Sequence, residues 1–177
     1  MFTRRGDTGE TDTGSRKRVT KASAIIEVEG RIDSVNSFLG LAWSKCQWDD
    51  MKKDLALVQE DLFVIGEELT AEGKNRTLAD ERLKWMEART LELKGEAGKI
   101  KLFIMPGGSE ISALFHVCRT QSRLLERTVV QAKEGMGVRP LVLSYLNRLS
   151  SLLFMHSVVA NVRLGISERI WSINREI

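Results

Sequence analysis

The chain has 177 residues, of which 42% are hydrophobic and 29% are charged, a balance typical of one folded globular domain. Its 27 basic and 24 acidic side chains leave a net charge of +3 and mostly alternate in sign, which does not favour nucleic acid as a partner. Cys46 and Cys118 lack the spacing of a disulfide framework or a zinc site, and no apolar run reaches the roughly 18 residues of a membrane span. We therefore expect a protein of the reducing cytoplasm that has no membrane partner.

Helical periodicity begins after an unpatterned first segment. Residues 1–22 are rich in Gly, Thr, Arg and Asp and are expected to form an arm that becomes ordered around a ligand. Behind the arm, apolar residues recur at alternating spacings of three and four, which is the pattern of helices packed side by side in a bundle. These stripes run from Ile25 to Ala42, Met51 to Leu69, Leu83 to Ile100 and Val142 to Ala160.

Three breaks separate the helical segments. The first is a turn at 72–76, after which Thr77 is expected to cap the next helix. The second ends at Ser109, the expected N-cap of a helix that runs to about Glu134, and the third contains Gly137 and Pro140. The chain is thus predicted to be an all-α bundle of about five helices. It is a single domain, 1–177, divided into the arm 1–22, the bundle 23–163 and a tail 164–177.

Two regions have the composition of an anion site. Closely spaced glycines in the arm let backbone N–H groups converge on an anion, although the arm is not a Walker A sequence and a terminal segment without a ligand is the alternative. In the fourth helix Arg119, Arg123 and Arg127 share one side with a single acid, Glu126. Three guanidiniums and one carboxylate leave positive charge in excess, so this face is either a phosphate site or a salt-bridged surface.

Other chemistry is not indicated. His156 lies on an apolar stripe and is expected to be a core residue. No Glu-x-x-His is present, which excludes a match to the di-iron bundles, and no Ser-His-Asp or Cys-His arrangement is evident.

Several short motifs occur in an order that covers nearly the whole chain. They are Thr3 with 6–11, then Arg18 and Lys21, Gly30-x-x-Asp33, Phe103-Ile104-Met105-Pro106-Gly107-Gly108, Cys118-Arg119 through Glu126-Arg127, and Leu146-Asn147-Arg148-Leu149-Ser150. As an ordered set they resemble the ATP:cob(I)alamin adenosyltransferases of the propanediol-utilisation type.

The resemblance implies a five-helix bundle, ferritin-like or cobalamin adenosyltransferase-like, assembled as a homotrimer with active sites between subunits. It implies transfer of the 5′-deoxyadenosyl group of ATP to the Co(I) of cob(I)alamin, with Mg²⁺ bound mainly through the ATP phosphates. A flavin reductase and a cobalamin-dependent enzyme are the further partners that it suggests.

Residue roles follow by position in the motifs. The implied ATP-binding residues are Thr3, Arg4, Arg5, Gly6, Thr11, Asp12, Arg18, Lys21, Arg123, Glu126, Arg127 and Asn147. The implied catalytic set is Phe103, Arg119, Asp33 and Arg123. Within it, Asp33 and Arg119 match a salt bridge across the subunit boundary, and Phe103 matches the aromatic residue that displaces the axial base below the corrin.

Two positions depart from the family pattern, since Ser34 and Ser151 stand where acidic residues are usual. These departures put subunit pairing and corrinoid contacts in question. An inactive helical ATP-binding sensor or interaction subunit is the alternative function, and a purely structural trimer is a third. Phe103 argues against the sensor, because ATP sensing has no use for that residue.

Overall fold

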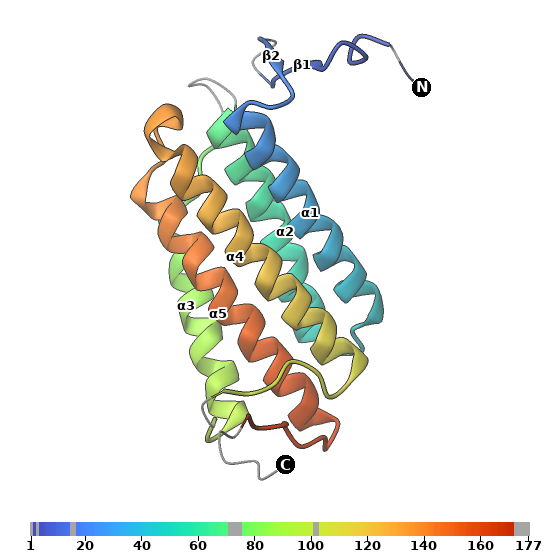
Figure 1. The fold of residues 1–177 in the computed structure, drawn as a ribbon. Coiled ribbons are helices and arrows are strands. Elements are labelled where there is room, and N and C mark those ends of the chain that lie inside the picture. The colour runs from blue at the N-terminus through green and yellow to red at the C-terminus, as the bar shows by residue number, and fades with distance from the viewer. Residues whose placement is uncertain (1, 3, 15–16, 71–75, 101–102, 172–177) are drawn as a thin grey trace.

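Five helices run alongside one another in the computed structural model of the protein, which describes residues 2, 4–14, 17–70, 76–100 and 103–171. They are α1 (Ala24–Lys45), α2 (Asp49–Thr70), α3 (Asp80–Ala97), α4 (Glu110–Met136) and α5 (Pro140–Arg163). Figure 1 shows an elongated bundle with the arm at one end and the C-terminal tail at the other. The predicted five-helix bundle is confirmed. None of the described helices is long and apolar enough to cross a membrane.

The helices meet along the predicted apolar stripes. α4 packs against α1 and α5, α5 also packs against α3, and α1 packs against α2. Every predicted stripe residue of α2 and α5 is buried: Met51, Leu55, Val58, Leu62, Ile65, Leu69, Val142, Leu146, Leu149, Leu153, His156 and Ala160. Removing such a stripe from water supplies the main stabilisation of a bundle.

A few buried polar groups join α2 to α3 and α5. Asp54 Oδ2 accepts a hydrogen bond from Arg89 Nε at 2.7 Å and lies 3.0 Å from His156 Nε2. Tyr145 donates its hydroxyl to Asp61 Oδ2 at 2.6 Å. His156 is fully buried, so its prediction as a core residue is confirmed.

The breaks before and after α4 agree with the sequence. The Ser109 hydroxyl accepts a hydrogen bond from Ser112 N at 3.2 Å and caps the first turn of α4. Gly137 ends the helix in the left-handed conformation, and Pro140 opens α5 in its first turn.

The cap predicted at Thr77 is wrong. α3 begins at Asp80, and Ala79 occupies the N-cap position without a side-chain hydrogen bond. The cause is a contact with α2: Leu78 is buried and its backbone N–H donates to Glu68 Oε2 at 2.8 Å, so the chain stays extended for longer. Of the turn predicted at 72–76, only Arg76 lies within the described residues.

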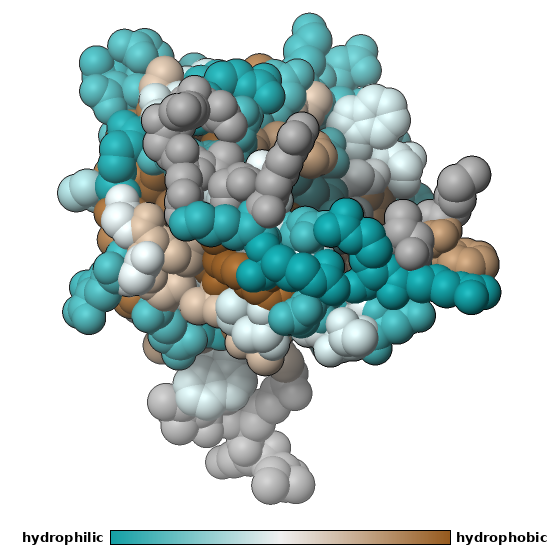
Figure 2. All heavy atoms as spheres, turned by 90° about the horizontal axis from the view of Figure 1, so that it is seen from above, coloured by the Kyte–Doolittle hydropathy of each residue, from teal (hydrophilic) through white to brown (hydrophobic). Residues whose placement is uncertain are grey.

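The arm contains a small β-hairpin that the sequence pattern did not indicate. β1 (Glu10–Asp12) pairs antiparallel with β2 (Arg18–Thr20), and Thr11 lies opposite Val19. Gly9 precedes β1 with φ +81°, and its carbonyl accepts from Lys21 N at 2.8 Å. Figure 2, which looks onto this end of the bundle, shows mainly hydrophilic atoms here, with an apolar stretch between them.

Candidate active site

The hairpin brings most of the arm's predicted nucleotide residues into one segment and pairs two of its cations. Arg5 Nη2 lies 3.1 Å from Asp12 Oδ2, and Arg18 Nε donates to Glu10 Oε2 at 3.0 Å. Arg18 also donates to the backbone carbonyl of Arg5. All four side chains are at least one-third exposed, so these pairs stabilise the hairpin only weakly.

A second contact fixes the start of the arm. Lys21 Nζ donates to the carbonyl of Gly6 at 2.8 Å, and a Cβ at position 6 would lie 3.0 Å from the same nitrogen. Arg4 takes the left-handed conformation with φ +60°, which is uncommon for a residue other than glycine. Thr11 is half-buried in β1, and Thr3 lies outside the described residues.

The α4 face has unpaired cations. Arg123 and Arg127 are exposed, and within the described part of the chain neither forms an ion pair. The one acid between them, Glu126, accepts a hydrogen bond from Asn147 Nδ2 at 2.9 Å. The carboxylate is thereby directed toward α5, and the two guanidiniums remain available to an anion.

Arg119 is half-buried on the same helix and contacts a histidine. Its Nε donates to His116 Nδ1 at 3.3 Å. Burial, followed by the charge of Arg123, lowers the pKa of the Arg119 guanidinium, as expected for a cation without a nearby carboxylate. Its predicted partner Asp33 is exposed on α1, and the described residues of one chain include no ion pair between them.

A cleft of about 290 Å³ opens between α3, α4 and α5. It is lined by Thr90, Arg119, Arg123, Ser150, Ser151, Phe154 and Met155. Two cations and no acid line it, because Ser151 stands where an acidic residue was expected from the family pattern.

Phe103 lies at the opposite end of the bundle from the arm, and the tail holds it by backbone pairing. Trp171 N donates to Phe103 O at 2.8 Å, Met105 N donates to Arg169 O at 2.8 Å, and Ile104 forms an antiparallel bridge with Ile170. Phe103 has φ +59° and is 70% exposed, and its ring meets the ring of Trp171 edge to face at 5.7 Å. A large apolar ring is therefore presented to the outside from a strained backbone position.

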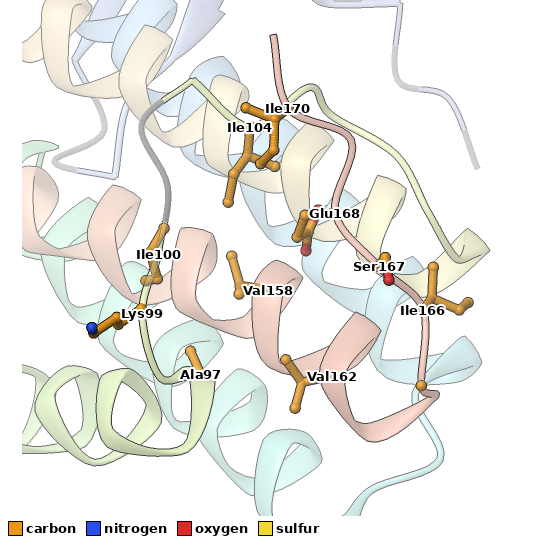
Figure 3. Close-up of a pocket in the computed structure, with 11 residues that line it drawn as sticks. Ala97, Lys99, Ile100, Ile104, Val158, Val162, Ile166, Ser167, Glu168 and Ile170 are labelled. Carbon is orange, nitrogen blue, oxygen red and sulfur yellow. The ribbon is translucent and has the colours of Figure 1, made fainter. Parts of the chain in front are cut away.

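Behind the paired segments 103–105 and 169–171 is a cavity of about 400 Å³. Figure 3 shows Ile104 and Ile170 together on one side of it and Val158 and Val162 of α5 below, with Glu168 between them. Burial raises the pKa of the Glu168 carboxyl. Apolar side chains line the cavity together with Lys99, Ser167 and Glu168, and Ile104 joins it to the loop that carries Phe103.

Asn161, fully buried near the end of α5, joins that loop to the tail. Its Nδ2 donates to Gly107 O and to Glu168 Oε1, each at 3.0 Å, while its Oδ1 accepts from Ser109 N and Ser109 Oγ, each at 2.9 Å. Gly108 is required beside it, since φ is +95° and a Cβ there would lie 2.3 Å from Asn161 Nδ2.

Where the structure describes them, the two halves of the predicted nucleotide site do not meet within one chain. Figure 1 shows the arm extending beyond the end of the bundle and away from α4 and α5. Among the described residues, no hydrogen bond or ion pair joins the arm to Arg123, Glu126, Arg127 or Asn147. The same part of the chain contains no group of three or more His, Cys, Asp or Glu residues that could hold a metal ion.

Comparison with known proteins places the chain in a family. The family model described as cobalamin adenosyltransferase matches residues 1–160. The chain belongs to the cobalamin adenosyltransferase family. A corrinoid adenosyltransferase of Bacillus subtilis (strain 168) is 36% identical over 174 residues, covering 95% of this chain and 90% of that protein. A cobalamin adenosyltransferase of Cupriavidus metallidurans is 34% identical, covering 99% and 96%.

Solved structures agree with this cobalamin adenosyltransferase assignment. A PduO-type ATP:co(I)rrinoid adenosyltransferase variant from Lactobacillus reuteri, complexed with ATP, superposes with a TM-score of 0.90 at 26% identity and covers 97% of this chain and 100% of that one. A second variant from the same organism, complexed with cobalamin and ATP, has the same fold, with a TM-score of 0.92 at 24% identity over 100% of this chain and 99% of that one.

Sequence reasoning missed three contacts in this adenosyltransferase-family chain. His116 was not connected to Arg119, although their spacing of three places them on one helix face. The pairing of the tail with residues 103–105 joins segments more than 60 residues apart, and no local pattern indicates it. Asn161 could have been singled out as a polar residue within an apolar helix.

Proposed function

We propose that this protein transfers the 5′-deoxyadenosyl group of ATP to the Co(I) of a reduced corrinoid, cob(I)alamin. The observation that carries the proposal is the family match over residues 1–160, which contains every motif of the resemblance found in the sequence. The relatives that match nearly end to end are named as corrinoid or cobalamin adenosyltransferases. Because Co(I) is itself the nucleophile, the reaction requires none from the protein.

The reaction is a displacement at carbon. The electron pair of Co(I) forms a cobalt–carbon bond to C5′ of ATP, the C5′–O bond breaks, and triphosphate leaves with its electron pair. The protein therefore has two tasks, to align cobalt with C5′ and to offset the charge of the leaving group.

The unpaired cations of α4 suit the second task. Arg123 and Arg127 are exposed and free of carboxylates in the described chain, and planar guanidiniums bind phosphate oxygens in a bidentate manner. We assign the arm residues and Asn147 to the remainder of the ATP site. Since no metal-binding group of side chains is found among the described residues, Mg²⁺ would arrive on the ATP phosphates, and no step is assigned to it.

A homotrimer would bring the two halves of the site together. The described residues of the arm and the α4 face have no polar contact in one chain, so we build the site from the arm of one subunit and the α4 face of the next. In the same arrangement Asp33 of one subunit would pair with Arg119 of its neighbour, since neither has a carboxylate or cation partner across the described chain. We retain the division into arm, bundle and tail, 1–22, 23–163 and 164–177, as part of this proposal.

Phe103 is proposed to occupy the lower face of the corrin. An apolar ring there would keep the axial base from cobalt and so ease the reduction of Co(II) to Co(I). Its exposure and its contact with Trp171 fit that role.

The buried free thiols Cys46 and Cys118 accord with the cytoplasm as the compartment of this protein. A flavin reductase and a cobalamin-dependent enzyme would be its partners there.

The test is an anaerobic assay of the purified protein with chemically reduced cob(I)alamin, ATP and Mg²⁺. Loss of the Co(I) absorbance with formation of adenosylcobalamin and triphosphate is the expected result. If ATP binds and no product forms, the inactive sensor replaces the enzyme as the function.

A Phe103→Ala variant examines the corrin contact separately. We expect ATP affinity to remain within about twofold of the unmodified protein, because Phe103 pairs with the tail, which Figure 1 shows at the other end of the bundle from the arm. The spectrum of four-coordinate, base-off Co(II) should disappear. An unchanged spectrum would remove Phe103 from the mechanism.

A further inference from the structure

His116 is a buried polar residue to which the proposed mechanism gives no task. It lies on α4 with 4% of its surface exposed, and its ring meets Phe154 of α5 edge to face at 6.1 Å. Its one hydrogen bond among the described residues is the 3.3 Å contact in which Nδ1 accepts from Arg119 Nε. The His116 ring thus packs against Phe154 and accepts a hydrogen bond from Arg119. Both of these neighbours line the cleft between α3, α4 and α5.

The imidazole is neutral in this setting. Burial, followed by the positive charge of Arg119, lowers the pKa of His116 to about 4. Since Nδ1 is the acceptor, the proton must be on Nε2, and that buried nitrogen has no partner in the described chain. A buried donor left without an acceptor lowers stability, so as a core-filling residue His116 is a poor choice compared with leucine.

A neutral acceptor differs from a carboxylate in its effect on Arg119. A carboxylate in this position would neutralise the guanidinium and compete for its two terminal nitrogens. The imidazole takes only the Nε proton and cancels no charge. The Nη1 and Nη2 edge of Arg119 keeps its positive charge and its four remaining donors for a second partner.

We propose that His116 is a positioning residue, which orients Arg119 through Nε so that the charged edge of the guanidinium is presented to an acidic or anionic partner at the active site. The inference rests on the proposed function, because it acts through a residue assigned to that site. It predicts that the role of His116 depends on an acceptor at the position of Nδ1 and on Arg119 itself.

Three substitutions separate positioning from packing. His116→Leu fills the space without an acceptor, and we expect its turnover number to fall about tenfold while its melting temperature stays the same or rises. His116→Asn carries its Oδ1 on Cγ, as histidine carries Nδ1, and should recover turnover to within about threefold. His116→Gln sets the acceptor one carbon further out and should remain close to the leucine variant.

A double-mutant cycle tests whether His116 acts through Arg119. In an Arg119→Ala background, His116→Leu should change turnover by less than about twofold, because the orientation of the guanidinium no longer matters. Equal effects of His116→Leu in both backgrounds would overturn the proposal. So would a leucine variant of full activity, or one whose lost turnover asparagine does not recover.

A measurement without turnover keeps this inference distinct from the function. In ¹⁵N-histidine spectra, the Nδ1 signal of His116 should report an unprotonated acceptor and should move when Arg119 is replaced by alanine. An inactive unmodified protein that shows this contact would overturn the proposed function and, with it, the role of His116. An active protein without the contact would overturn the positioning role alone.

Discussion

The arm and the α4 face are both rich in arginine, yet they differ in how that charge is used. In the arm, Arg5 and Arg18 face Asp12 and Glu10. On α4, neither Arg123 nor Arg127 has a carboxylate partner within the described chain. Composition would treat both segments alike as phosphate sites. The difference teaches that an arginine is available to bind phosphate when it lacks a carboxylate partner, and that the number of arginines in a segment does not indicate this.

Local geometry explains the difference. The hairpin register sets Asp12 opposite Arg18, so complementary charges become cross-strand neighbours. In α4 a step of four residues sets Arg119, Arg123 and Arg127 along one side of the helix, where like charges repel. Glu126 accepts a hydrogen bond from Asn147 and forms no ion pair with these arginines. The repulsion between the arginines is therefore relieved only when an anion binds there.

Removing the α4 cations should have the largest effect. Arg123→Ala and Arg127→Ala should each lower ATP affinity or turnover at least about tenfold, and the double variant about a hundredfold, because each removes a charged contact of ~1.5–3 kcal/mol. Arg76→Ala is the matched control, since Arg76 is an exposed arginine that is paired with Glu67 at 3.0 Å. Steady-state kinetics with varied ATP make the comparison. Unchanged constants in both single variants would remove the phosphate assignment.

The buried His116 should make stability depend on pH. Its folded-state pKa, about 4, lies below the usual 6.5, so between these values the unfolded chain binds a proton that the folded chain does not. Stability should therefore fall as the pH decreases from about 6.5 and level off below about 4, by roughly 3 kcal/mol in total.

Urea unfolding at pH 7 and pH 4.5 measures this loss. The same pair of measurements on His116→Leu cancels the contribution of the carboxylates, and that variant should lose less stability. Equal losses in the two proteins would show that Arg119 and burial do not depress the protonation of His116.

The proposed pair of Arg119 with Asp33 of a neighbouring subunit can be tested by removing either side chain. Arg119→Ala or Asp33→Ala should lower activity about tenfold and shift the mass in sedimentation toward smaller species, if the pair spans two subunits. The exchange Asp33→Arg with Arg119→Asp should recover part of both. Glu27→Ala is the control, because Glu27 is an exposed acid of α1 that pairs with Arg31 of the same helix. A fully active single variant of unchanged mass would contradict the pairing.

The smallest effect is expected in the arm. Glu10→Gln removes one of the two carboxylates near Arg18, which keeps Asp12 at 3.6 Å, and ATP affinity should rise by up to about threefold. The melting temperature should change little, because the pair is exposed. Calorimetric titration with MgATP gives the affinity, and a marked loss would indicate that the pair is needed to shape the arm.

The bundle was predictable from sequence because its physics is local. Stripes such as Met51 to Leu69 repeat every three or four residues, and Ser109 and Gly137 mark helix ends by their own chemistry. The Thr77 cap failed because the hydrogen bond of Leu78 N to Glu68, ten residues earlier, decides where α3 begins.

The site was only partly predictable, because several of its contacts join segments that are distant in the sequence. Arg119, Arg123 and Arg127 could be placed on one helix face by counting residues, but nothing in that count indicates that Glu126 bonds Asn147. The pairing of Phe103 with Trp171 depends on two segments brought together by the whole fold. Such contacts follow from tertiary packing, which overrides local pattern.

The four hydrogen bonds of Asn161 have a consequence for amide exchange. The amide of Ser109 is bonded to Asn161 Oδ1, and Gly107 O is bonded to its Nδ2, so this loop cannot open alone while α5 remains intact. Despite its two glycines, the segment before α4 should therefore exchange with deuterium as slowly as the last turns of α5. The two segments, about fifty residues apart, then form one cooperative unfolding unit, and the motion of Phe103 is limited by the fraying of a distant helix end.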